Sequence, residues 1–164
     1  MLYFILSGGN MENLEKTVEV LNDLVKINND RIAGYKKAID NLSEIDADLR
    51  KLFNRLMIQS EELKAELQEH LGGWDGKSDS KTTLPGRIYR LWMDFKVIFA
   101  VNDRKALLEA CEYGEDAAQK AYRAAEQEPD ILPTSRALIT NQKVKLLASH
   151  DLIKELRDEE KTEA

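Results

Sequence analysis

The chain has 164 residues, the size of one ordinary domain, and a third of its residues are charged. Its 30 acidic and 24 basic side chains give a net charge of -6 at pH 7, which disfavours attraction to phosphate backbones and argues against a nucleic-acid partner. The single cysteine, Cys111, has no partner for an internal disulfide and suits a reducing compartment. We therefore expect one cytoplasmic domain.

The N-terminus begins with six apolar residues, Met1 to Leu6, followed by Ser7-Gly8-Gly9-Asn10. A membrane-spanning helix needs about 20 apolar residues, and a signal peptide needs basic residues before its apolar part. Neither condition is met, so we expect no membrane association. Because Met11 directly precedes a helical pattern, residues 1–10 are interpreted as an extension that is non-native or mis-called. The alternative is a genuine apolar arm that touches a membrane surface.

Apolar residues spaced three and four apart predict a first helix over residues 12–42. A second stripe predicts another helix over residues 47–71, and the short connection makes the two antiparallel neighbours. Asp46 is expected to cap the second helix by accepting hydrogen bonds from its free amides. The stripe of the first helix consists of Leu14, Val18, Leu21, Val25, Ile32, Tyr35, Ile39 and Leu42, with Asn28 at the missing place.

The polar residues 74–81 predict a loop, after which Leu84-Pro85 starts a third helix that runs through Phe99. The pattern pauses near residues 101–103, and either Asn102 or Asp103 is expected to cap a second half that begins at Arg104. A last helix is predicted over 133–157, and residues 159–164 form a tail that frays. The domain thus covers residues 11–158.

Four long helical segments with short turns, and no strand-like alternation, predict an all-α fold. We expect an antiparallel four-helix bundle with a break in the third helix near residues 101–103.

Five separated motifs, in order, resemble one bacterial family. It is a four-helix-bundle family catalogued as a domain of unknown function in the ferritin-like superfamily, and the resemblance covers about residues 12–157. It implies a ferritin-like bundle in the bacterial cytoplasm but no established reaction, so no catalytic residue is carried over. The motifs are Asn22-Asp23-Leu24, the segment from Asn28 to Tyr35, the segment from Gly86 to Lys96, the segment from Cys111 to Asp116, and Ser149-His150-Asp151.

Ferritin-like di-iron proteins bind metal through a glutamate from each of two helices and a Glu-x-x-His pair from each of the other two. Here Leu67 stands three residues before His70, and Leu147 stands three residues before His150. Both ligand pairs are therefore absent. Glu112 and Glu115 share a helical face, but oxygen-rich metal sites need more ligands than two.

Polar residues on the predicted buried faces have two interpretations. Asn28, Tyr35 and Gln142 are expected to form a polar layer that fixes the register of the helices, because buried polar groups need hydrogen-bond partners. If a functional site exists, we expect it where donors, acceptors and one titratable imidazole converge. The candidate residues are Tyr35, Glu112, Glu115, Tyr122 and His150.

The sequence has no Gly-rich phosphate loop, Cys-x-x-Cys pair or serine elbow, and burial beside Glu112 disfavours a Cys111 thiolate. The leading hypothesis is a non-catalytic interaction or structural protein, related to stress, with a protein partner or a homodimer and no cofactor. The alternative is a metal-binding protein with a degenerate carboxylate and histidine site for iron, manganese or zinc.

Overall fold

The computed structural model describes residues 8–72, 74, 84–93 and 103–163. Every regular element among them is helical, so the predicted all-α class is confirmed, and no described helix is long and apolar enough to cross a bilayer. The elements are α1 (Gly8–Asp40), the 3-10 turn η2 (Glu44–Asp46), α2 (Ala47–Leu71), α3 (Arg87–Met93), α4 (Arg104–Glu126) and α5 (Pro133–Glu163).

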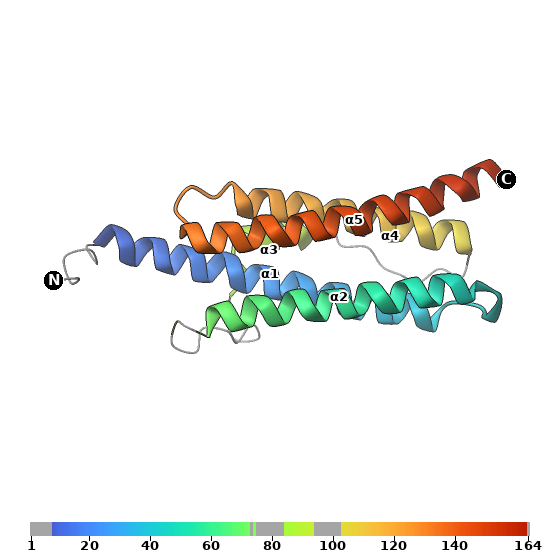
Figure 1. Cartoon of the computed structure of the whole chain (residues 1–164), viewed down its shortest axis with the longest axis horizontal. Coiled ribbons are helices and arrows are strands. Elements are labelled where there is room, and N and C mark those ends of the chain that lie inside the picture. Colours follow the sequence, from blue (N-terminus) through green and yellow to red (C-terminus); the bar gives the residue numbers. More distant parts are fainter. Residues whose placement is uncertain (1–7, 73, 75–83, 94–102, 164) are drawn as a thin grey trace.

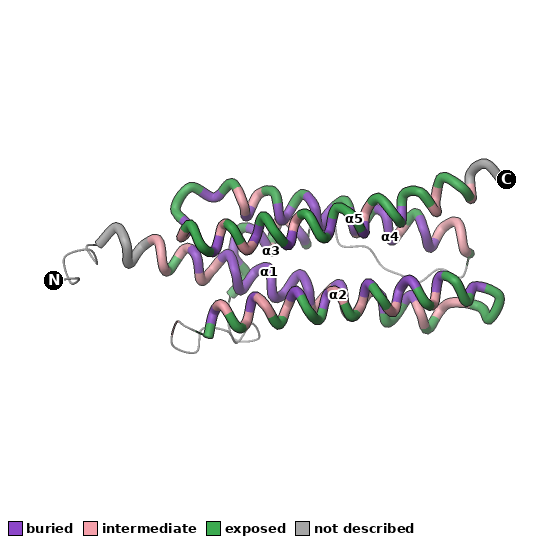
Figure 2. Tube along the Cα trace, viewed as in Figure 1, coloured by how far each residue is buried: buried purple, intermediate pink, exposed green. Residues whose placement is uncertain are grey.

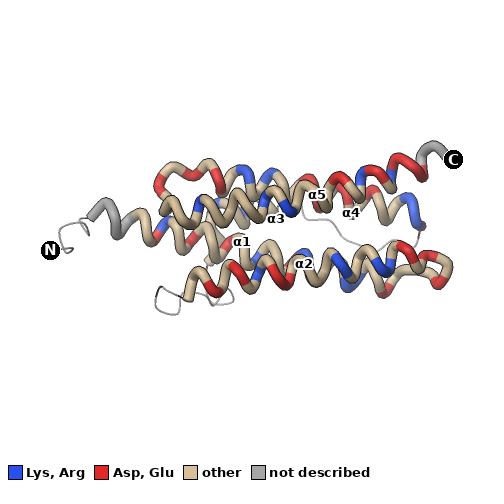
Figure 3. The backbone as a smooth tube through the Cα atoms, in the orientation of Figure 1, with Lys and Arg blue, Asp and Glu red and all other residues tan. Residues whose placement is uncertain are grey.

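The four long helices run along the long axis of the molecule as two pairs (Figure 1). Helices α1 and α2 pack against each other, as do α4 and α5, and each pair is joined by a short connection that makes its members antiparallel. The short helix α3 packs against both α1 and α4. Lys and Arg are interspersed with Asp and Glu along the long helices (Figure 3).

Buried residues line the inward sides of the helices, and exposed residues line the outward sides (Figure 2). The apolar core consists of two clusters. The first contains Leu24, Leu67 and Tyr122, and the second contains Phe53 and Leu108. Burial of each large apolar side chain contributes about 1.5–3 kcal/mol. Buried polar residues separate the two clusters along the helices, and Asn28, Arg31, Ser60 and Glu115 among them belong to the first candidate site described below.

Helix α1 is buried without interruption from Val20 to Asn28. An amphipathic helix normally leaves one side to solvent, and this segment does not, because α3 also packs against α1. Asp23 Oδ1 accepts a hydrogen bond from the Gly86 amide at 2.9 Å, and Asp23 Oδ2 accepts one from the Tyr89 amide at 3.1 Å. Asp30 accepts from Tyr89 Oη at 2.7 Å and Trp92 Nε1 at 3.0 Å. Polar contacts therefore dock α3.

The predicted range of α2 and the predicted start of α4 are confirmed. Asp103 caps α4 by accepting a hydrogen bond from the Ala106 amide at 3.0 Å. Helix α1 begins earlier and ends two residues earlier than predicted, and α3 begins at Arg87 rather than at Leu84-Pro85. The predicted break near residues 101–103 lies largely in the segment 94–102, outside the described residues.

Two predictions about helix ends are wrong. The Asp46 carboxylate makes no capping bond to α2, because it accepts from Ser43 Oγ at 3.0 Å and Arg104 Nη1 at 2.9 Å. Helix α5 continues to Glu163, beyond the predicted end at Arg157. Arg104 Nε donates to Glu160 Oε1 at 2.6 Å, which ties this last part of α5 to the start of α4. Fraying of residues 159–164 stays a prediction.

Candidate functional site

A buried ion pair joins α1 to α4. Arg31 Nη2 lies 2.9 Å from Glu115 Oε1, and the two side chains are only 3% and 1% exposed. Tyr35 donates its hydroxyl to the same carboxylate oxygen, and Arg31 Nη1 donates to Ser60 Oγ on α2 at 2.8 Å. Burial by itself lowers the pKa of Arg31, but the Glu115 carboxylate and its neighbours outweigh it, so the pKa is raised and the guanidinium stays charged.

The hydrogen bonds continue from this ion pair to α5. Arg31 Nη1 donates to Asn28 Oδ1 at 3.4 Å, and Asn28 Nδ2 donates to Tyr122 Oη at 2.8 Å. Tyr122 donates in turn to Gln142 Oε1 at 2.8 Å. Gln142 Nε2 then donates to the Leu63 carbonyl at 3.1 Å and to Glu66 Oε1 at 3.0 Å. Burial raises the pKa of Tyr122, which keeps its hydroxyl protonated and able to donate.

This network contains residues from all four long helices, and we call it the buried polar layer. The predicted polar layer of Asn28, Tyr35 and Gln142 is confirmed in that all three are buried and hydrogen-bonded. The layer contains one unsatisfied atom, Glu115 Oε2, which is buried without a hydrogen-bond partner. The members of the layer are Asn28, Arg31, Tyr35, Ser60, Glu115, Tyr122 and Gln142.

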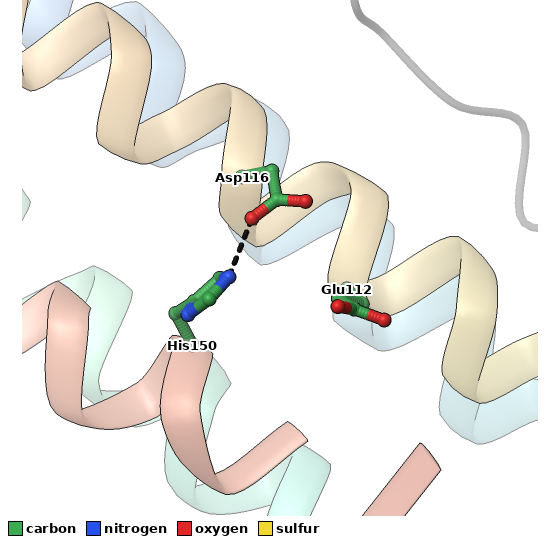
Figure 4. Close-up of side chains that lie close together, drawn as sticks. All are labelled: Glu112, Asp116 and His150. Atoms are coloured by element: carbon green, nitrogen blue, oxygen red, sulfur yellow. Dashed lines mark hydrogen bonds and ion pairs between the residues drawn. The ribbon is translucent and has the colours of Figure 1, made fainter. Parts of the chain in front are cut away.

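A second group of polar residues lies between α4 and α5, in which Glu112 is buried and Asp116 is exposed (Figure 4). Glu112 and Asp116 are one helical turn apart on α4, and His150 reaches from α5 toward Asp116. His150 Nε2 bonds to Asp116 Oδ1. One ligand atom from each of the three residues lies within 4.8 Å of the other two. We call these three residues the α4–α5 cluster.

Charged side chains next to the α4–α5 cluster form ion pairs with its members. Arg157 Nη1 forms an ion pair with Glu112 Oε2, and His150 Nδ1 lies 3.1 Å from Asp151 Oδ1. Partial burial by itself lowers the pKa of His150, but the hydrogen bonds to Asp151 and Asp116 outweigh it, so the pKa is raised. The imidazole therefore holds a proton at a higher pH than a free histidine does.

The five predicted site residues fall into two places. Tyr35, Glu115 and Tyr122 belong to the buried polar layer, whereas Glu112 and His150 belong to the α4–α5 cluster. The structure adds three residues that belong neither to the candidate set nor to the predicted polar layer.

The added residues are Arg31, Ser60 and Asp116. Asp116 stands four residues after Glu112, a spacing that puts both on one helical face. Arg31 and Ser60 carry no comparable signal, because nothing in a sequence pairs their two helices residue by residue.

Residues 16–128 match the model of a family described as Domain of unknown function (DUF2383), which covers more than half of the chain. Searches of curated proteins and of solved structures find no significant match.

Proposed function

The chain belongs to the DUF2383 family, and we propose that it is a non-catalytic protein that acts by contacting other proteins, including a second copy of itself. The observation that carries this proposal is the closed buried polar layer. Apart from Glu115 Oε2, its donors and acceptors bond to one another across four helices, so they are not available to a substrate. Breaking such bonds inside a core costs more free energy than breaking them in water.

The Arg31 guanidinium disfavours metal binding within the layer. The Arg31 guanidinium already lies against Glu115, the most buried carboxylate of the predicted site. A metal ion there would have to displace a buried cation and leave it without its counter-charge, which is strongly unfavourable. The layer is better suited to holding the helices in register than to chemistry.

The outward side of α5 supports protein contacts. Val144, Leu147 and Leu152 are 61%, 47% and 36% exposed, and Ala148 beside them is exposed as well. Val144, Ala148 and Leu152 are spaced four apart and form one ridge along the helix. The opposite side of α5 already packs in the core through Ile139, Leu146 and Ile153. A second apolar stripe on a helix is typical of a contact surface.

The proposal also covers the fold class of the protein, its bacterial origin and its cellular location. The packed helix pairs support a four-helix bundle of the ferritin-like superfamily, and the resemblance of the motifs supports a bacterial origin. The acidic composition and the free Cys111 support a cytoplasmic location.

Light scattering coupled to size-exclusion chromatography tests the contact surface. The full chain at micromolar concentration is expected to have the mass of a dimer. Changing Val144, Leu147 and Leu152 together to serine is expected to give the mass of a monomer with unchanged helix content. The matched control changes Ile45 and Ile58, which are also exposed, and should keep the dimer mass. A wild-type chain that remains monomeric contradicts self-association.

A further inference from the structure

The α4–α5 cluster has the ligand types and the spacing of a binding site for a metal ion. Glu112 and Asp116 offer carboxylate oxygens from one side of α4, and His150 offers an imidazole nitrogen from α5 (Figure 4). One ligand atom of each lies within 4.8 Å of the other two. Metal–ligand bonds of about 2.0–2.2 Å place the ligands of one ion up to roughly 4.4 Å apart. Small side-chain rotations would therefore bring all three atoms onto one ion.

We propose that Glu112, Asp116 and His150 bind one divalent ion of the first transition row, of the class of Zn²⁺, Mn²⁺ and Fe²⁺. An imidazole ligand favours these ions over Mg²⁺ and Ca²⁺, which prefer oxygen ligands only. Three protein ligands leave further positions on the ion for water. The proposal goes beyond the proposed function, because neither the α5 stripe nor the buried polar layer requires it.

The location of the site differs from the interior position that the predicted five-residue site implies. Glu115 and Tyr35 face the buried Arg31, whereas Asp116 is half exposed and lies on the side of α4 that meets α5. A hydrated ion can therefore approach the α4–α5 cluster at Asp116 without unfolding the core, and it reaches the buried Glu112 when Arg157 moves away. The interior keeps its own cation, the Arg31 guanidinium.

Arg157 is the internal competitor for this ion. Its Nη1 is paired with Glu112 Oε2, and its Nη2 also lies 2.8 Å from Asp158 Oδ1. The Nε of Arg157 is buried without a hydrogen-bond partner, so its present position leaves one donor unsatisfied. Arg157 can therefore release Glu112 and keep its pairing with Asp158. In the metal-bound form, the divalent ion would take over the counter-charge for Glu112.

Binding at this place would join two helices. Glu112 and Asp116 belong to α4 and His150 belongs to α5, so an ion bound by all three adds a link between helices that already pack. A ligand that binds the folded chain and not the unfolded chain stabilises it in proportion to the logarithm of its concentration above Kd. The melting temperature is therefore expected to rise with the concentration of Zn²⁺.

The test uses the full chain purified without an affinity tag and treated with a chelator, then titrated with Zn²⁺ or with Co²⁺ as a spectroscopic probe. We expect one ion per chain, visible Co²⁺ absorption bands and a higher melting temperature. Asp116→Asn and His150→Gln should each weaken binding at least about tenfold, because even partners outside the ligand set change metal affinity by that factor. Helix content by circular dichroism checks that both variants fold.

Two further variants make the assignment specific. His70→Gln removes the other histidine of the chain, which bonds to Ser135 about four helical turns from His150 along α5, and should bind as the wild type does. Arg157→Gln removes the competing cation and should bind more tightly. Absence of saturable binding, or equal binding by wild type, Asp116→Asn and His150→Gln, overturns the proposal. Neither result changes the oligomer mass, so failure here and failure of self-association are distinguishable.

Discussion

At the scale of single residues, the loss of Arg31 or of Glu115 is expected to lower the free energy of unfolding strongly. Both are buried, and each is the charge partner of the other. Glu115→Gln leaves the guanidinium buried without its counter-charge, and loss of one partner of a buried pair costs about 3–5 kcal/mol. We expect the free energy of unfolding, measured by urea titration, to fall by about that amount. Glu109→Gln, an exposed change on the same helix, should stay within about 0.5 kcal/mol of wild type.

Cys111 offers a second test of how buried charge acts on a neighbour. Burial first, and then the Glu115 carboxylate, raise the pKa of the thiol well above its ordinary value. The expected direction is confirmed, although the charge responsible is that of Glu115 rather than that of Glu112. At pH 8 the folded chain should hold Cys111 as the unreactive thiol. A disulfide reagent should therefore modify it only at the rate of unfolding, and fast labelling of the native chain would contradict its burial.

The residues of the two candidate sites show where prediction from sequence ends. Helical periodicity placed Asn28, Tyr35 and Gln142 on buried faces, because each face repeats within one helix. The pairing of Arg31 with Glu115 depends on how α1 and α4 are staggered, and no periodicity within a helix contains that information. The same limit explains why Glu112 and His150 were grouped with Tyr35. The stagger of α4 against α5 places them with Asp116 instead.

At the scale of elements, side chains of α1 stabilise α3, which is too short to be stable by itself. It has only seven residues, and helices that short are not stable alone. Asp23→Ala removes the acceptor of the Gly86 and Tyr89 amides and should cost about 1–2 kcal/mol, as for a lost helix cap. We expect faster hydrogen exchange of the α3 amides with little change in α2. Glu15→Ala, an exposed change on α1, is the control.

Gly86→Ala tests the same contact between α1 and α3 by changing the residue that precedes α3. A Cβ on residue 86 would lie 2.4 Å from Asp23 Oδ2 and 2.6 Å from Glu19 Oε1, so α3 or these carboxylates must move. The variant should reproduce the hydrogen-exchange pattern of Asp23→Ala. Unchanged exchange in α3 for both variants would show that its other contacts suffice to dock it.

Helix boundaries that depend on local signals were predictable from the sequence, and those that depend on distant contacts were not. The range of α2 and the start of α4 were predictable, because the apolar stripe of α2 and the Asp103 cap of α4 are local signals. The end of α5 was not, because its last turns carry no apolar stripe, and the contact described there is the ion pair of Glu160 with the distant Arg104. The prediction that Asp46 caps α2 failed for the same reason, since its carboxylate forms an ion pair with Arg104. Local capping rules fail where a distant charge competes.

At the scale of the whole molecule, the buried polar layer joins the two apolar clusters, since Tyr122 belongs to the first and Tyr35 to the second, and it connects both helix pairs. Apolar contacts alone tolerate a shift of one helix along another, because one apolar side chain substitutes for the next. A hydrogen-bonded layer does not tolerate it, because a shift leaves buried donors and acceptors unpaired, at about 1–3 kcal/mol each. The layer therefore specifies one stagger of α1, α2, α4 and α5, and it couples the two pairs.

Tyr122 is the link on which that coupling depends, since its hydroxyl accepts from Asn28 of α1 and donates to Gln142 of α5. Tyr122→Phe keeps the ring and leaves Gln142 Oε1 without this donor, so the free energy of unfolding should fall by about 1–3 kcal/mol. Tyr113→Phe, at a half-exposed position of α4, should change it by less than about 0.5 kcal/mol.

The shape of the unfolding transition distinguishes coupling from a merely local loss. Tryptophan fluorescence reports on Trp92 of α3 and on Trp74 just after α2, and circular dichroism reports on all the helices. In the wild type the two signals should change together, because the layer makes the pairs unfold as one unit. In Tyr122→Phe both should shift to lower urea, and any separation between them should be wider than in Tyr113→Phe. Coincident curves at wild-type stability would mean that apolar packing alone couples the two pairs.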